Sequence, residues 1–294
     1  MKICGQVDSP GNTTEIRLFE MNIGDDRVVE IGETLRNNQD VKVLNLSKNV
    51  FGDDGLEALA HAFVTDTALE RVVLGDNPRI GVRGLTALGE ALGKHTTTIQ
   101  LLSLTNCELG SLECHALSTS GLSSNLHLQE LLLHSNFIGD EGVTTLAHAL
   151  KRNSSLKVLD LSDNPIGDDG FRGLYEGLRG NQHLTHLYLN DNRVSEYGLQ
   201  QMVYLVDANA SLLALHTKTH SHATSKTSTI TPEQEALLEL VEFYLLLNNK
   251  GRLFLREDPP PNLVSPVLAR ISNQADVLYA MIRDKPHLIA SFGR

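Results

Sequence analysis

Acidic pairs recur along the chain, and they are the first residues whose type and spacing could bind a metal ion. They are Asp25–Asp26, Asp53–Asp54, Asp140–Glu141 and Asp168–Asp169. A calcium site needs about six to eight converging oxygen atoms. Each pair, however, stands at the same place before its own stretch of helical pattern, so the pairs would form a row and not a cage. We interpret them as solvated helix starts, where negative charge favours the positive end of a helix.

A histidine cluster has the spacing of a transition-metal site. His216, His220 and His222 lie in the segment HTKTHSH, and imidazole nitrogens are common ligands of zinc. No cysteine or carboxylate stands within this segment to complete the ligand set. The segment is better explained as a decayed repeat followed by a loop, and we expect no metal there.

The cysteines indicate structure more than reactivity. The chain has 3 of them, Cys4, Cys107 and Cys114, which is too few and too odd a number for a disulfide framework and indicates a reducing compartment. We expect Cys107 and Cys114 to be buried as small apolar side chains. The alternative is a redox role for this pair.

Nucleotide-binding and hydrolytic motifs are missing from the sequence. The segment from Gly89 to His95 has Gly93 and Lys94, but its glycines are too close together and His follows the Lys where a phosphate loop needs Ser or Thr. No Ser-His-Asp grouping can be placed, and no carboxylate pair stands apart from the repeated turns. We therefore predict no catalytic residue, no cofactor and no metal ion.

Charge and hydropathy exclude two further classes of partner. The 294 residues carry 36 acidic and 25 basic side chains, a net charge of −11, whereas nucleic-acid binding requires a basic surface. No apolar run is long enough to span a membrane, and the first residues lack the apolar core of a secretory signal. The sequence predicts a protein that does not insert into membranes and lies in the cytoplasm, with the nucleus as an alternative.

A repeat determines the expected architecture. The frame L-x-x-L-x-L-x-x-N, with apolar substitutions, fits six segments well and two less well. The six are 41–49, 69–77, 99–107, 128–136, 156–164 and 184–192, and the weaker copies are 13–21 and 212–220. The ninth position thus falls at residues 21, 49, 77, 107, 136, 164, 192 and 220. So regular a period indicates a solenoid.

The second half of each repeat predicts a helix. After the Asn comes a Gly-Asp turn, and apolar residues then recur at Leu56, Leu59, Ala60 and Phe63, the spacing of a helix buried along one side. Each repeat is therefore one coil made of a short strand and a helix. Neither element can bury its apolar face alone, and stacking the coils buries a continuous leucine core.

This pattern resembles the leucine-rich repeat family over about residues 13–220, in the class of about 28–29 residues per repeat found in ribonuclease inhibitor, NOD-like receptors and the Ran GTPase-activating protein. The resemblance implies an α/β solenoid, a right-handed horseshoe with parallel strands on the concave face and helices on the convex face. It also implies a structural ladder of side chains at the ninth position, in which Cys107 replaces Asn. The ladder residues are Asn49, Asn77, Cys107, Asn136, Asn164 and Asn192.

The last quarter of the chain changes character. We divide the sequence into a repeat domain at 1–220, a Ser/Thr-rich loop at 221–231 and a helix-strand-helix cap at 232–294. Thr231 and Gln234 have the spacing of a capping box for a helix to about residue 247. A ninth strand at Leu253 and Leu255 and two helices, near 265–272 and 274–284, would follow. This tail resembles the C-terminal ends of uncharacterised leucine-rich repeat proteins of diatoms and related algae.

The predicted binding surface consists of the third and fifth residues of the frame, which point away from the core because neighbouring strand residues alternate faces. Its candidate residues are Val43, Val73, Leu101, Leu132, Val158, Asp160, His186 and Tyr188. An apolar stripe of this kind is typical of a partner site. Asp76, Asp163 and Asp191, with His134, add an acidic flank that suits a basic or amphipathic protein. The alternative is that these residues only pack within the chain.

The expected function is that of a non-catalytic scaffold that binds another protein on the concave face. One alternative is a regulator of a small GTPase, resembling the Ran GTPase-activating protein, with Arg79 in the lengthened turn NPRIG reaching the nucleotide. Another is a stand-alone sensor related to NOD-like receptors. The repeat pattern determines no oligomeric state.

Overall fold

The computed structural model describes residues 14–65, 67–94, 96–217 and 231–249. The chain divides into two compact units, Met1–Leu245 and Leu246–Arg294, and the strands of the repeats belong to the first. The predicted ninth strand, the two last helices, His220, His222, Cys4 and most of the Ser/Thr-rich loop lie outside the described residues.

One parallel sheet runs through the first unit, with eight strands in the order of the sequence, β1-β2-β3-β4-β5-β6-β7-β8. The strands are β1 Glu15–Arg17, β2 Val43–Asn45, β3 Arg71–Val73, β4 Leu101–Ser103, β5 Glu130–Leu132, β6 Val158–Asp160, β7 His186–Tyr188 and β8 Ala214–His216. Each contains the third to fifth residues of one copy of the frame, including the two weak copies. Equivalent residues pair directly, as Val43 does with Arg71. The repeat period is thus also the register of the sheet.

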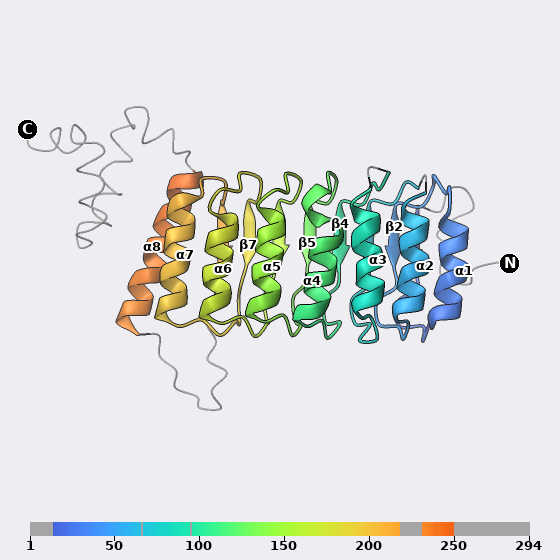
Figure 1. Cartoon of the computed structure of the whole chain (residues 1–294), viewed down its shortest axis with the longest axis horizontal. Helices are drawn as coiled ribbons and strands as arrows, with labels where there is room; N and C mark the ends of the chain where they lie inside the picture. The colour runs from blue at the N-terminus through green and yellow to red at the C-terminus, as the bar shows by residue number, and fades with distance from the viewer. Residues whose placement is uncertain (1–13, 66, 95, 218–230, 250–294) are drawn as a thin grey trace, which may run out of the picture. The chain divides into compact units, whose positions relative to one another are not determined.

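A helix follows each strand, so the described chain is an α/β solenoid, and Figure 1 shows the helices side by side in one layer with the strands behind them. The helices are α1 Asp25–Leu35, α2 Asp53–Phe63, α3 Val82–Leu92, α4 Ser111–Ser120, α5 Asp140–Leu150, α6 Asp168–Leu178, α7 Glu196–Ala208 and α8 Pro232–Asn249, with a 3-10 turn η1 at Leu122–Ser124. We call each strand from β1 to β7, with its following helix, coil 1 to coil 7. Among the described residues no helix combines the length and apolarity needed to cross a membrane.

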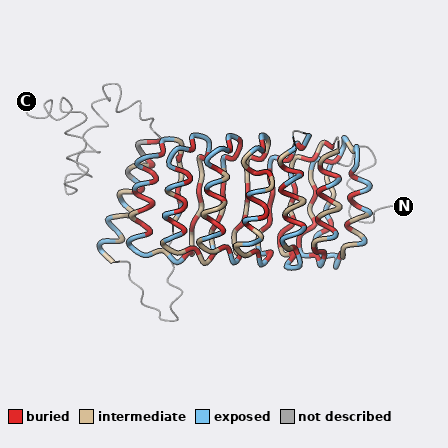
Figure 2. Tube along the Cα trace, viewed as in Figure 1, coloured by how far each residue is buried: buried red, intermediate tan, exposed pale blue. Residues whose placement is uncertain are grey.

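The core lies between the sheet and the helices. The middle residue of each of the strands β2 to β8 is buried, as are the inward apolar residues of the helices, among them Phe63 and Phe171. In Figure 2 the buried parts of the trace accordingly face the interior of the stack. Burial of these apolar side chains is the main force that holds the coils together. The free energy gained is proportional to the apolar area that is removed from water.

The first turn of α8 confirms the predicted capping box. The Thr231 hydroxyl accepts the Gln234 N–H at 3.1 Å, and the Gln234 side chain accepts the Thr231 N–H at 3.1 Å. The helix places Val241 in the core, with Leu237 and Leu240 packed against it. The predicted apolar side of this helix therefore covers the core.

Candidate protein-binding surface

The ninth residue of each repeat links successive coils inside the stack. Asn77 accepts the Asn49 N–H at 3.1 Å and donates to the carbonyls of Leu46 at 3.0 Å and Leu74 at 2.8 Å. Equivalent residues make equivalent bonds, and we call the set the Asn ladder: Asn49, Asn77, Asn136, Asn164 and Asn192. Each amide reaches back to the preceding coil and holds the two strands at a fixed spacing.

Cys107 occupies the ladder position of coil 4. Its thiol lies 3.4 Å from the Leu74 carbonyl oxygen and 3.5 Å from that of Thr105, so a weak donor replaces the amide. Burial raises the pKa of the Cys107 thiol to about 12, and it raises the pKa of Cys114 to about the same value. Both thiols are therefore protonated and unreactive at neutral pH.

A second set of asparagines, which the sequence analysis missed, joins the coils where the helices end. Asn153 donates to the Leu122 carbonyl at 2.8 Å and accepts the Leu156 N–H at 2.8 Å. The residues of this set are Asn125, Asn153, Asn181 and Asn209. Their regular spacing along the chain was a readable signal. Asn38 accepts the N–H groups of Asp40 and Val41 at the equivalent position of coil 1.

The strand face carries the predicted binding residues in two rows that follow the register. One row contains Val43, Leu101, Val158 and His186, and the other contains Val73, Leu132, Asp160 and Tyr188. The apolar residues alternate between the rows from one coil to the next. The predicted stripe is therefore a zigzag, in which each apolar side chain has polar neighbours on both adjoining strands.

The strand face is least exposed at β4. Leu101 and Ser103 are both only 6% exposed, and Leu101 lies in register between the longer side chains of Arg71 and Glu130. The other seven candidate residues are half-buried. Leu101 thus offers little surface to a partner, a departure from the expected continuous stripe.

The face ends in an aromatic stack on β7 and β8. The rings of Tyr188 and His216 lie 4.8 Å apart and are nearly parallel, at 9°. His186, beside them on β7, has its Nδ1 atom 2.9 Å from the Thr185 hydroxyl. His216, considered in the sequence only as a metal ligand, therefore belongs with Tyr188.

The acidic flank takes part in contacts between coils. Asp76 accepts the Asn106 amide at 2.6 Å, and Asp163 accepts the Ser135 hydroxyl at 2.8 Å. Both aspartates have a positive φ, 57° and 53°, which Asp tolerates better than most residues. These contacts fix the carboxylates along one border of the strand face.

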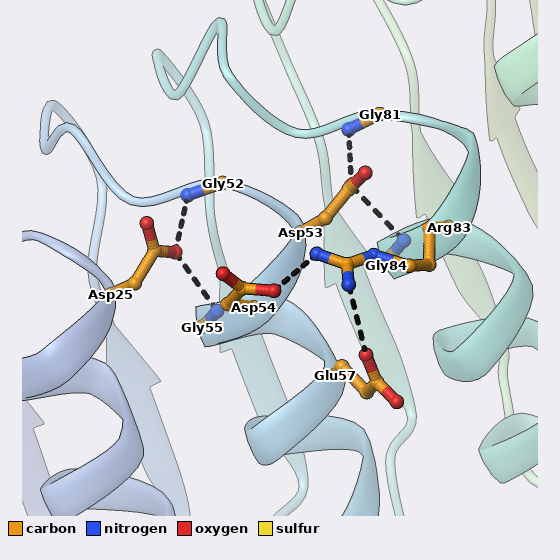
Figure 3. Close-up of polar contacts among 9 residues, drawn as sticks. All are labelled: Asp25, Gly52, Asp53, Asp54, Gly55, Glu57, Gly81, Arg83 and Gly84. Atoms are coloured by element: carbon orange, nitrogen blue, oxygen red, sulfur yellow. Dashed lines mark hydrogen bonds and ion pairs between the residues drawn. The ribbon is translucent and has the colours of Figure 1, made fainter.

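The sequence suggested that the acidic pairs at the helix starts are solvated. The structure shows that the first acid of each pair also has partners within the chain. In each of four coils the first acid accepts backbone N–H groups of the next coil, as Figure 3 shows for the first two. Asp53 Oδ1 accepts Gly81 N–H at 2.7 Å and Gly84 N–H at 3.0 Å. We call this set the Asp ladder: Asp25, Asp53, Asp140 and Asp168. The glycine is required at residue 84 because a Cβ atom there would lie 2.8 Å from Asp53 Oδ1.

Two arginines near these turns have partners within the chain. Arg83 pairs with Asp54, and this hydrogen bond raises the Arg83 pKa further above its ordinary value. Arg79 Nη1 donates to the Val50 carbonyl at 3.0 Å. In the part of the chain that the structure describes, no group of three or more His, Cys, Asp or Glu side chains has the arrangement of a metal site.

Comparisons with known proteins agree with this architecture. The leucine-rich repeat family model matches residues 37–60, 124–147, 152–174 and 180–200. Mouse (Mus musculus) NACHT, LRR and PYD domains-containing protein 5 is 33% identical over 145 residues, covering 49% of this chain and 12% of that protein. Pig (Sus scrofa) ribonuclease inhibitor is 29% identical over 151 residues, covering 51% of this chain and 33% of the inhibitor. The chain thus matches only a part of each relative.

A solved structure of leiomodin-1 actin-binding site 2 aligns with a TM-score of 0.45 at 16% identity, covering 59% of this chain and 95% of that one.

Proposed function

We propose that this chain, a leucine-rich repeat protein of the class that includes ribonuclease inhibitor and the NACHT, LRR and PYD domains-containing proteins, is a non-catalytic scaffold that binds a partner protein on its strand face. The observation that carries the proposal is the half-buried part of that face from β5 to β8, which is more accessible than β4. There Leu132 and Val158 alternate with polar neighbours, and the stacked ring of Tyr188 stands beside His186. Aromatic anchors are typical of the energetic centre of an interface.

The acidic border of the strand face indicates that the proposed partner carries positive charge. Asp160 lies between Leu132 and Tyr188 in the register, and Asp163 lies three residues further along the chain. A partner with basic residues beside an apolar patch would complement this arrangement, which favours fast and specific association. The net charge of −11 acts in the same direction.

Regulation of a small GTPase is not supported by the rim cation that the sequence suggested for it. The Arg79 guanidinium is bonded to the Val50 carbonyl, and using it on a nucleotide would require that bond to break. Hydrolysis assays with a panel of small GTPases separate the two functions, because a scaffold accelerates none of them.

The test of the scaffold is affinity capture from the source cell, followed by mass spectrometry and a binding measurement with the purified partner. The variant Leu132→Glu/Tyr188→Glu places two charges on the proposed face while leaving the core leucines unchanged. Leu126→Glu is the matched control, because Leu126 is an exposed leucine outside the strand face. We expect a partner that binds wild type and the control but not the double variant. Equal binding by all three proteins would contradict the proposal.

A further inference from the structure

The helix layer, on the other side of the sheet, has a groove of about 750 Å³. The N-terminal halves of α4, α5 and α6 form its walls. Leu112 and His115 line it from α4, Glu141 and Thr144 from α5, and Asp169 and Arg172 from α6. None of these residues belongs to the strand face, so the groove is a separate surface.

Leu112 is an unusual residue for its position. It is the second residue of α4, and the second residues of α1, α2, α3, α5 and α6 are Asp26, Asp54, Arg83, Glu141 and Asp169. Where these five helices carry a charge, α4 carries a leucine that is 72% exposed, and α7 carries Tyr197 at 53% exposure. Phe137, in the turn that leads into α5, is 64% exposed. Exposing two large apolar side chains to water at one end of neighbouring helices is unfavourable, and such exposed apolar patches are typical of interaction sites.

The Asp ladder is interrupted at the same place. Val82 replaces the ladder aspartate of coil 3, and Ser111 replaces that of coil 4. Glu113 stands where α2, α3, α5 and α6 have Gly, and its carboxylate accepts the N–H of Gly110 at 3.0 Å. Coil 4 thus has no carboxylate link to the next helix start, and the contact there runs from the Cys114 thiol to the Gly142 carbonyl oxygen at 3.4 Å. None of these contacts uses the Leu112 side chain, which is 72% exposed.

Charge and shape indicate what could fill the groove. Its lining includes the carboxylates of Asp140, Glu141 and Asp169 against the one guanidinium of Arg172, which pairs with Asp169 at 3.1 Å. Leu112 and His115 form an i, i+3 ridge on α4, and Glu141 and Thr144 form another on α5. A groove between such ridges accepts the side chains of a third helix.

We propose that this groove binds an amphipathic helix of a second partner protein, with Leu112 against its apolar side and Glu141 and Asp169 against its Lys or Arg residues. The scaffold would then hold two proteins on opposite sides of its sheet. This inference does not require the strand-face function, because the two surfaces share no residue.

The probe is a synthetic, fluorescently labelled helical peptide of about 18 residues, long enough for about five turns, with leucines along one side and lysines flanking them. Its binding to the full chain is measured by fluorescence anisotropy, beside a peptide with Glu in place of every Lys. We expect saturable binding of the lysine peptide only. Leu112→Glu should weaken it about tenfold or more, the loss of one buried anchor. Glu141→Lys should weaken it several-fold, and more strongly at low salt.

Two variants control for folding and for location. Leu126→Glu changes another exposed leucine of the same coil, at 54% exposure, and should leave the affinity unchanged. The strand-face variant Leu132→Glu/Tyr188→Glu should also bind normally. If only the strand-face variant loses binding, the peptide belongs to the proposed scaffold surface and the groove proposal is wrong. Equal binding of both peptides, equal binding by Leu112→Glu, or no saturation up to about 1 mM would each overturn it as well.

Discussion

The Asn ladder and the Asp ladder solve the same problem in two regions of the stack. Each uses one side chain per coil to accept backbone N–H groups of a neighbouring coil. The Asn ladder reaches backward, as Asn49 does to the N–H of Ile23 at 3.0 Å. The Asp ladder reaches forward, as Asp25 does to the N–H of Gly52 at 2.8 Å. The Asn ladder therefore ties neighbouring coils at the strand side, and the Asp ladder ties the first three coils and the last three at their helix starts.

The difference between them is burial, and it explains the choice of residue. Asn77 has no exposed surface, and its amide both accepts an N–H and donates to carbonyls, so all its polar atoms are satisfied without a net charge. Asp53 lies at the partly exposed rim and meets only N–H groups. A carboxylate is favourable there, because only acceptors are needed and water solvates the second oxygen. The buried Asn ladder therefore needs amide side chains, whereas carboxylates are tolerated in the Asp ladder at the partly exposed rim.

The largest effect is expected for Asn77→Ala. This change leaves the Asn49 N–H and the Leu46 and Leu74 carbonyls without their partner inside the core, and we expect the free energy of unfolding to fall by roughly 3–4 kcal/mol. Asn77→Asp should cost at least as much, because it places a charge against buried carbonyl oxygens. Urea unfolding followed by circular dichroism measures both. A loss below about 1 kcal/mol for either variant would contradict the role of the Asn ladder.

A smaller effect, of about 1–2 kcal/mol, is expected for Asp53→Ala, which removes two bonds to partly hydrated N–H groups. Gly84→Ala should act through the same contact, because its Cβ atom would meet the Asp53 carboxylate. The double variant should then cost less than the two single losses added together. The same urea experiment tests this coupling, and strict additivity would show that the two residues act independently.

The sequence predicted the Asn ladder, and it could not predict the Asp ladder for a physical reason. Asn77 belongs to a frame whose period alone aligns it with Asn49, so its partners follow from the repeat. The bond from Asp53 to Gly84 joins two parts of the helix starts, and it becomes visible only when the distance between adjacent coils is known. Likewise the frame assigned Leu101 to the outer face, but it could not predict that Leu101 is only 6% exposed, in register between Arg71 and Glu130 on the flanking strands. The repeat period determines which face of the sheet a side chain points to, and the side chains on the neighbouring strands determine how exposed it is.

Restoring the missing step of the Asn ladder should stabilise the protein modestly. Cys107→Asn provides an amide where the thiol now meets the Leu74 carbonyl at 3.4 Å, and we expect a gain of about 1 kcal/mol. A loss of stability would show that coil 4 has no room for the amide.

The same variant also changes the response to alkali. Burial holds the pKa of Cys107 at about 12, against an ordinary value of 9.0, so above about pH 9 the unfolded chain releases a proton that the folded chain keeps. Stability therefore falls as pH rises through this interval, by up to about 1.4 kcal/mol per pH unit for each such thiol. Cys107→Asn removes one of these two contributions, while Cys114 keeps the other. Urea unfolding between pH 8 and pH 10 should show a shallower decline for the variant.

The smallest effect on stability is expected for Arg83→Ala, because Arg83 is more exposed than the residues of either ladder. Arg83 pairs with Asp54 and lies 4.0 Å from Glu57, directly beside the Asp ladder in Figure 3. Arg83 and Asp54 are largely solvated and Glu57 is partly so, and screening by water and salt therefore offsets what the pair contributes. The melting temperature should stay within about 1 °C of wild type at physiological salt, while Asp53→Ala lowers it in parallel samples. If Arg83→Ala destabilised the chain as much as Asp53→Ala, exposed ion pairs, and not the Asp ladder, would be what joins the coils at the rim.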